Sequence, residues 1–295
     1  MRESSHPVSF DLVKKGPLAS ESLTIKDLKC DQASIKEKTL LRSALLTSGF
    51  RQAEFEDCVF NHSYFERCYF RKARFTNVSF VGCLFKDCRF DEAEFRGCKL
   101  DRAEFHNCSI TYAQLAPCLP SEENLLRELA RNLRVNAQNR GQTEDCRRFL
   151  LAEIQASERH NFKKAFAWSD PYYGKKYSRF EDRLSGFWTW FWLKLEGFLW
   201  GHGEVPGRVI FSAILFILLF AAAFKGLKIG IRNMPSGASF LEYIGFSAAT
   251  LVTVAYGDLL PASFGGRLLA TFESGLGLIL FGFLVAALYR RISKR

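Results

Sequence analysis

Residues 53–95 read AEFEDCVFNHSYFERCYFRKARFTNVSFVGCLFKDCRFDEAEF, and every fifth residue from Phe55 to Phe95 is phenylalanine. The apolar column continues to Leu115, and a small side chain stands two positions before each of its members. The other positions of each quintet are mostly charged or polar. Helices and strands repeat their side-chain directions every ~3.6 or 2 residues, so neither has this period. The pattern predicts a solenoid in which each unit buries its apolar face only by stacking on the next.

The quintets resemble those of the pentapeptide-repeat family, which pair a small residue with Phe or Leu two positions later. The match runs from Ala33 to Cys118, and we assign residues 33–120 to the repeat and 1–32 to an N-terminal segment. The resemblance implies a right-handed quadrilateral β-helix of about twenty residues per coil, with coils ~4.8 Å apart. Two columns of small residues are then expected on neighbouring faces, namely Cys68, Cys88 and Cys108, and Ala73, Ala93 and Ala113.

The chain contains nine cysteines and no C-x-x-C pair. A metal or redox ladder is one interpretation of the stacked thiols. The other is that they are small apolar core groups, since Ala, Ser and Val occupy the same phase. The sequence favours packing, and a reducing compartment fits this usage.

Nucleic acid is not an expected partner. Some members of the resembled family mimic DNA with an acidic surface, but residues 51–104 carry equal numbers of basic and acidic side chains. The formal net charge of +10 gathers instead beside the apolar segments near the C-terminus. A polyanion mimic therefore has no physical basis here.

Residues 121–170 predict a helical connector. A capped amphipathic helix ending near Gly141 is favoured by Ser121, the two glutamates after it and a leucine-rich stretch. A second helix is expected to begin at Thr143. Such a hairpin caps a solenoid end or packs between subunits, and a partner-binding site is the alternative.

Residues 171–205 are crowded with aromatic side chains, among which Lys194 and Glu196 are interspersed. This stretch is too amphipathic to span a membrane. Because indole and phenol rings prefer the headgroup layer, it predicts an interfacial helix along the inner leaflet. A soluble aromatic core is the alternative.

Two apolar stretches predict membrane spans at 206–226 and 265–290. Each is long enough to cross ~30 Å of hydrocarbon as a helix. The N-terminus carries no apolar run after its charges, so we expect no secretory signal. Basic residues flank the spans at 175–183 and 290–295, which favours the inner membrane with both termini cytoplasmic. Lys225, Lys228 and Arg232 between the spans weaken this orientation signal.

Between the spans lies SFLEYIGFSAATLVTVAYGDLLP, residues 239–261. Ser239 and Glu242 form a capping box that predicts a helix over 240–251, too short to cross. Backbone at membrane depth is tolerated only where it is buried in protein or lines water. The C-terminal end of such a helix carries about half a negative charge, so several ends aimed at one cavity favour a cation.

Residues 253–258, Thr-Val-Ala-Tyr-Gly-Asp, resemble the potassium-channel filter T-V-G-Y-G-D, and the resemblance covers Val209 to Arg291. It implies a homotetramer with a re-entrant pore helix in an all-α, two-transmembrane pore domain over 206–295. It also implies filter sites for potassium, formed by the Thr253 hydroxyl and the carbonyls of Thr253, Val254, Ala255, Tyr256 and Gly257. Asp258 would support the filter by a hydrogen bond, and Gly277 falls at the gating hinge.

Ala255 departs from the family, which has glycine at a position that often needs positive φ, where alanine costs roughly 1 kcal/mol or more. Gly245 and Phe246 also stand where the family has pore-helix tryptophans. A selective potassium pore, a less selective cation pore and a non-conducting, membrane-anchored scaffold all stay open. An enzyme is not expected, because no nucleophile-and-base context, phosphate loop or metal-spaced histidine pair is present.

Glu273 is an ionisable residue inside the second span, which is costly without a partner or water. Gating, ion attraction, or a hydrogen bond to the back of the pore helix are its expected roles. We expect no cofactor. The gating stimulus and any cytoplasmic regulator of the solenoid are not readable from the sequence.

Overall fold

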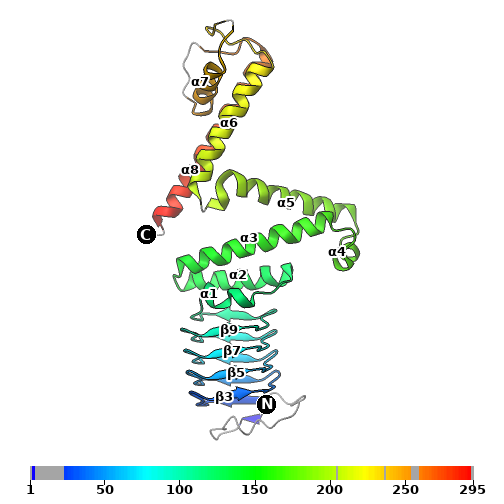
Figure 1. Ribbon diagram of the computed structural model, residues 1–295, viewed down its shortest axis with the longest axis vertical. Helices are drawn as coiled ribbons and strands as arrows, with labels where there is room; N and C mark the ends of the chain where they lie inside the picture. The colour runs from blue at the N-terminus through cyan, green and yellow to red at the C-terminus, as the bar shows by residue number, and fades with distance from the viewer. Residues whose placement is uncertain (1, 4–22, 204, 236, 254–258, 294–295) are drawn as a thin grey trace. The chain divides into compact units, whose positions relative to one another are not determined.

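The computed structural model describes residues 2–3, 23–203, 205–235, 237–253 and 259–293 (Figure 1). The chain forms two compact units, Met1–Trp190 and Phe191–Arg295. The first contains a β-solenoid and helices, and the second contains the long apolar helices.

All strands of the solenoid pair in parallel, each with the strand one coil further on. Phe65 pairs with Phe85, and Phe85 pairs with Phe105. Two faces are sheets, with the orders β1-β2-β4-β6-β8-β10 and β3-β5-β7-β9. The other two faces are ladders of single bridges, such as Val59 to Ser79 and Tyr69 to Arg89. The strands are β1 (Arg2–Glu3), β2 (Leu23–Lys26), β3 (Ser34–Lys36), β4 (Ala44–Leu46), β5 (Glu54–Glu56), β6 (Tyr64–Glu66), β7 (Arg74–Thr76), β8 (Leu84–Lys86), β9 (Glu94–Arg96) and β10 (Glu104–His106).

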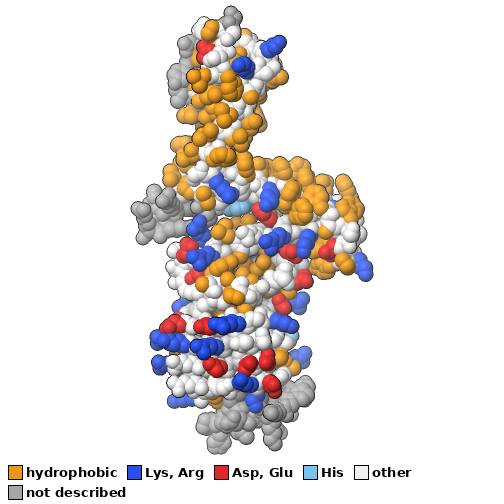
Figure 2. Space-filling model, viewed as in Figure 1, with side chains coloured by type: hydrophobic (Ala, Val, Ile, Leu, Met, Phe, Trp, Pro, Cys, Tyr) orange, Lys and Arg blue, Asp and Glu red, His pale blue; other side chains and the backbone are white. Residues whose placement is uncertain are grey.

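The solenoid predicted from the five-residue period is therefore confirmed, and so are the four sides implied by the resemblance to pentapeptide-repeat proteins. Beyond β1, its described coils run from Leu23, before the residue 33 expected from the sequence, because the loosely matching quintets after Leu23 pair like the later ones. Basic and acidic side chains are interspersed over its surface (Figure 2). Many lie one coil apart on the same face, as Arg74 and Glu54 do at 3.1 Å.

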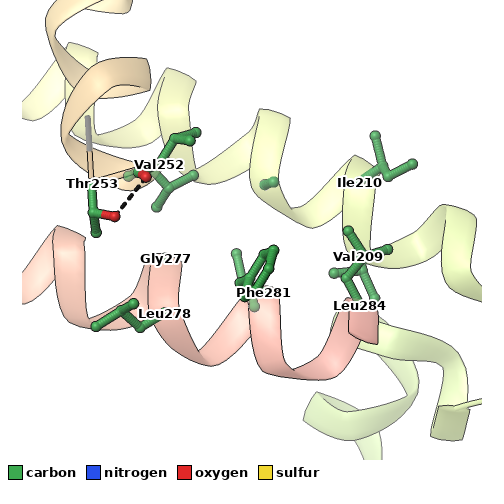
Figure 3. Close-up of a pocket in the computed structure, with 11 residues that line it drawn as sticks. Val209, Ile210, Val252, Thr253, Gly277, Leu278, Phe281 and Leu284 are labelled. Atoms are coloured by element: carbon green, nitrogen blue, oxygen red, sulfur yellow. Dashed lines mark hydrogen bonds between the residues drawn. The ribbon is translucent and has the colours of Figure 1, made fainter. Parts of the chain in front are cut away.

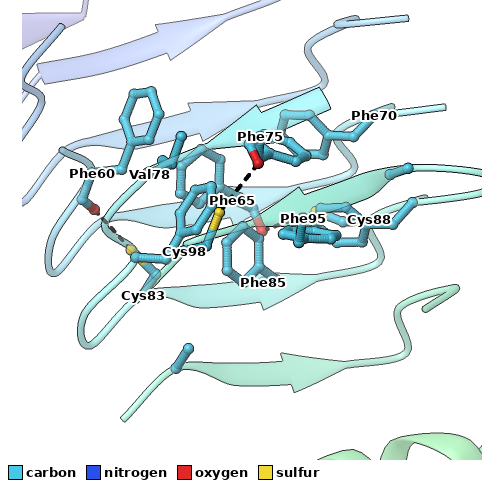
Figure 4. Packing of buried hydrophobic residues seen from close by; sticks show 14 of the residues in the cluster. Phe60, Phe65, Phe70, Phe75, Val78, Cys83, Phe85, Cys88, Phe95 and Cys98 are labelled. Carbon is cyan, nitrogen blue, oxygen red and sulfur yellow. Dashed lines mark hydrogen bonds between the residues drawn. The ribbon is translucent and has the colours of Figure 1, made fainter. Parts of the chain in front are cut away.

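The phenylalanine column fills the axis of the solenoid (Figure 4). The Phe70 ring stacks between those of Phe50 and Phe90, with centroids 5.2 and 5.1 Å apart and nearly parallel planes. The repeat cysteines are free and fill the small core position. The Cys83 thiol donates to the Phe60 carbonyl at 2.8 Å, so these thiols pack against the neighbouring coil.

The last quintet departs from the predicted stack. Ala113 was expected to continue the alanine column, but it is exposed and lies in helix α1 (Tyr112–Leu115). No further coil follows to pair with this segment, and the backbone N–H of Thr111 donates to Gln114 Oε1 at 2.8 Å at the start of the helix. A 3₁₀ turn, η2 (Ala116–Cys118), completes the end of the repeat.

Helix α2 (Glu123–Asn139) covers the end of the solenoid and supplies hydrogen bonds that the next coil would have made. Asn132 Oδ1 accepts from the Phe105 amide at 2.7 Å. Asn136 accepts from the Cys108 amide at 2.8 Å and donates to the Cys108 carbonyl at 2.9 Å. Two asparagine side chains thus substitute for backbone, which is the end-cap role expected for the hairpin.

Helix α3 (Thr143–Phe166) packs along α2, and Arg134 pairs with Glu153 between them at 2.8 Å. Helices α4 (Pro171–Lys176) and α5 (Phe180–Trp200) follow. His160 is buried against α4, with Nδ1 3.0 Å from the Tyr173 hydroxyl. Burial lowers the pKa of His160 to about 4, with the nearby Arg127, Lys164 and Lys176 charges acting in the same direction.

The aromatic stretch thus divides into two helices. Helix α5 keeps much of its aromatic surface exposed: Trp188 is 50% and Trp192 is 55% exposed. Figure 2 shows hydrophobic side chains over this helix.

In the second unit, the turn η3 (Gly201–Gly203) leads into α6 (Pro206–Gly226), α7 (Phe240–Leu251) and α8 (Phe264–Ser293). Residues 206–226 of α6 and 264–289 of α8 are long and apolar enough to span a membrane. Helix α7 packs on both. Phe220, Phe224, Ile231 and Phe246 form the core between the helices and the α6–α7 loop.

Candidate ion-conduction site

The segment 253–258, where the sequence predicts a filter, is anchored on both flanks. At the start of α7, the Ser239 amide donates to Glu242 Oε2 at 2.6 Å, which is the capping contact expected from the sequence. Beyond the filter, the Arg232 amide donates to the Leu260 carbonyl and the Ala262 amide to the Gly230 carbonyl, both at 2.8 Å. The loop before α7 is therefore paired with the segment before α8.

Helix α7 ends at Leu251, and Thr253 lies two residues beyond it. The φ of Thr253 is 59°, a left-handed conformation that a β-branched residue rarely adopts. Its hydroxyl donates to the Val252 carbonyl at 2.6 Å. Val252 is 64% exposed although it is apolar. The carbonyl end of α7, with its partial negative charge, lies beside these residues.

Helix α8 approaches the C-terminal end of α7 at a glycine. A Cβ atom on Gly277 would lie 1.8 Å from the Leu251 carbonyl oxygen and 2.8 Å from its carbon. One turn earlier, the Ser274 hydroxyl donates to the Thr250 carbonyl at 3.1 Å. Small residues allow such close backbone approach between membrane helices. Gly277, expected at a hinge, therefore has a packing function that sets the position of α7.

A buried polar contact lies on the same face of α8. Glu273 and Ser247 are each 0% exposed, and the Ser247 hydroxyl is hydrogen-bonded to Glu273 Oε1. The same hydroxyl lies 3.0 Å from the Ile217 carbonyl of α6. Of the roles that the sequence left open for Glu273, the structure contains a hydrogen bond to α7, through Ser247.

A cavity of about 420 Å³ opens below the end of α7, between α6 and α8 (Figure 3). Its walls are almost entirely apolar, with the Thr253 hydroxyl at one end and Phe281 and Leu284 toward the other. Apolar walls offer a cation no ligands, so an ion here would keep its water.

Two family models match parts of the chain. The model for "Ion channel" matches residues 210–294, and that for "Pentapeptide repeat region" matches residues 58–125. The chain joins a pentapeptide-repeat solenoid to an ion-channel domain. The two apolar helices of the ion-channel domain indicate a membrane protein. Neither matched family is a family of enzymes.

Solved structures similar to this chain include trypsin-treated QnrB1, a plasmid-mediated fluoroquinolone resistance protein, at 22% identity and a TM-score of 0.19. That match covers 30% of this chain and 55% of QnrB1, so the chain spans little more than half of it. A pentapeptide repeat protein (Rfr23) from the cyanobacterium Cyanothece matches at 10% identity and TM-score 0.13, over 29% and 86% of the two chains. One from the Arabidopsis thaliana thylakoid lumen matches at 16% identity and TM-score 0.14, over 35% and 76%. A search of curated proteins finds no match.

Within the ion-channel domain, Thr253 follows the end of α7 and lines the cavity with Gly277. The other predicted filter residues, Val254, Ala255, Tyr256, Gly257 and Asp258, lie outside the described residues. Sequence reasoning missed Ser247 and Ser274. Their only signal is that each is polar within an apolar helix at membrane depth, a pattern that marks a helix contact.

Proposed function

We propose that this protein is the subunit of a homotetrameric channel that conducts potassium through a filter formed by Thr253 to Gly257. The observation that carries the proposal is the short helix α7 between two apolar helices, ending at the Thr-Val-Ala-Tyr-Gly-Asp segment within the ion-channel domain. One subunit supplies one helix end and one set of carbonyls. Four copies are needed to surround an ion and replace its hydration shell.

The exposed apolar surface of the ion-channel domain is consistent with this assembly. Val252, which follows α7, and Leu278 and Phe281 on α8 are exposed. In a tetramer such residues would face the central cavity or a neighbouring subunit. A carbonyl end of α7 from each subunit would then favour a cation at the centre.

The proposal includes selectivity for potassium over sodium. This part needs its own test, because Ala255 replaces the first glycine of the resembled filter. Single-channel recording of the purified protein in planar bilayers, under asymmetric potassium and sodium, tests it. Reversal near the potassium equilibrium potential is expected. Reversal near zero would show a non-selective cation pore instead, and Ala255→Gly should then restore selectivity if alanine is the cause.

A membrane-anchored scaffold is the second candidate, favoured by Ala255 and by the pentapeptide-repeat region. Both candidates predict the same fold, so ion flux separates them. Liposomes that contain the protein and pass no cation at any tested potential would favour the scaffold.

We place the protein in the inner membrane with both termini in the cytoplasm, where α5 lies along the headgroup layer. The exposed Trp188 and Trp192 support the headgroup placement of α5. Quenching of their fluorescence by brominated lipids is expected, and Trp188→Ser with Trp192→Ser should reduce it. The solenoid would then be free to meet a cytoplasmic regulator. Recording after deletion of residues 1–118 would show whether the solenoid affects opening.

A further inference from the structure

The search for unexplained groups leads to Glu273, a fully buried side chain where α6, α7 and α8 meet. A carboxylate at membrane depth is costly unless it is paired with a charge or reached by water. The other ionisable side chains on α6, α7 and residues 264–289 of α8 are Arg208 and Lys225, Glu242 and Tyr243, and Arg267 and Tyr289. Among the described residues, Ser247 is its only side-chain partner, and it forms no ion pair.

The hydrogen-bond count at Ser247 shows where a proton is needed. The Ser247 oxygen lies within hydrogen-bonding distance of Glu273 Oε1 and of the Ile217 carbonyl oxygen. A hydroxyl has one proton to donate, whereas an ionised carboxylate and a carbonyl are both acceptors only. With Glu273 ionised, one of these two oxygen pairs would lack a proton between its members. With Glu273 protonated, the acid donates to Ser247 and Ser247 donates to Ile217.

The second carboxyl oxygen leads to the same conclusion. Glu273 Oε2 is buried, and no described residue gives it a hydrogen-bond partner. An ionised carboxylate would leave half of its charge on this oxygen without a donor, which costs more than leaving a neutral carbonyl unpaired. Both oxygens of Glu273 thus fit the neutral acid better than the anion.

We propose that Glu273 is a protonated positioning residue of the ion-conduction site, whose proton completes a hydrogen-bond chain through Ser247 to Ile217 and so holds α7 between α6 and α8. The conduction part of this statement rests on the proposed function. This hydrogen-bond chain meets α7 at Ser247, less than two helical turns before Thr253, where the proposed filter segment begins. Loss of the proton would remove the donor and place a charge in the helix junction. At alkaline pH, α7 should therefore shift between α6 and α8 and support the filter less well.

The first test does not depend on conduction. Infrared difference spectra of the full-length protein in lipid, wild type against Glu273→Gln, should contain the C=O stretch of a protonated carboxylic acid at neutral pH. This band should disappear on alkalinisation. Absence of the band at neutral pH would show that Glu273 is ionised and would overturn the inference, whether or not the protein conducts.

The second test examines positioning through variants. Glutamine keeps an N–H donor toward Ser247 but cannot ionise, so Glu273→Gln should conduct with a flat pH profile. Wild-type flux should fall as the pH is raised, and Glu273→Leu should have reduced flux at every pH. Ser247→Ala should add no further loss in the Glu273→Leu background. Parallel pH profiles for wild type and Glu273→Gln would refute the positioning role even in a working channel.

Discussion

Replacement of Gly277 by alanine tests the close contact between α7 and α8. The added Cβ would lie 1.8 Å from the Leu251 carbonyl oxygen. Favourable contact between heavy atoms begins at ~3.5 Å, so the two helices would have to separate locally by more than ~1 Å. A main-chain carbonyl cannot rotate away as the end of a flexible side chain can.

The expected cost follows from that geometry. Overpacking typically costs ~1–3 kcal/mol, and a backbone obstacle places Gly277→Ala at or above the upper end of this range. Gly275 and Gly282 lie in the same helix with nothing within 4 Å of an added Cβ. Alanine at those positions should instead stabilise by up to ~1 kcal/mol, because it has the higher helix propensity.

Thermal unfolding of the full-length protein in detergent measures the difference. Gly277→Ala should melt below wild type, whereas Gly275→Ala and Gly282→Ala should melt at or above it. Equal melting temperatures for the three variants would show that α8 does not approach Leu251 so closely, and would leave the hinge as the only role for Gly277.

Three further predictions concern the first unit. Asn136→Leu should destabilise the protein by ~2 kcal/mol or more, because the buried Cys108 amide and carbonyl lose their partner. Substitution of the exposed Asn139 by leucine is the control. Equal denaturation midpoints for the two variants would contradict the capping role of Asn136. Phe70→Ala should cost ~3–5 kcal/mol, since the ring is stacked on both sides in the core; a midpoint shift no larger than that of a surface variant would refute this. His160 should lower stability as the pH falls from ~6.5 toward 4, because the unfolded chain takes up a proton that the buried imidazole, with its pKa lowered to about 4, does not. Unfolding midpoints measured across this range should fall with pH in wild type through this term, which His160→Phe lacks. Identical dependence of the midpoint on pH in the two proteins would exclude His160 as its source.

The solenoid could be predicted because its five-residue period indicates stacked units, and the resemblance to pentapeptide-repeat proteins implied the four-sided coil that sets the register. A small residue and an apolar residue recur at fixed phase, so each coil can stack on the next in only one way. The end of the repeat could not be predicted. Asn132 and Asn136 resemble ordinary helix residues in the sequence, and their role depends on where α2 crosses the last coil.

At the site, too, local features could be predicted from the sequence, whereas contacts between helices could not. The bounds of α7 follow from its capping box and its apolar run, which are local. The partner of Glu273 is 26 residues away, and the register between α7 and α8 decides which polar residue it meets. Resemblance suggested a hinge at Gly277, whereas the required closeness to Leu251 is visible only once the helices are packed.

The asparagine cap on α2 also makes the solenoid a spacer of adjustable length. Cap contacts involve only the final coil, while every earlier coil bonds to neighbours at the same offset, as Phe55 with Phe75 and Phe75 with Phe95. Removal or duplication of one whole coil would rejoin the ladders in phase and leave α2 seated as before. The repeat can therefore change its reach in steps of ~4.8 Å without any redesign of the helices that follow.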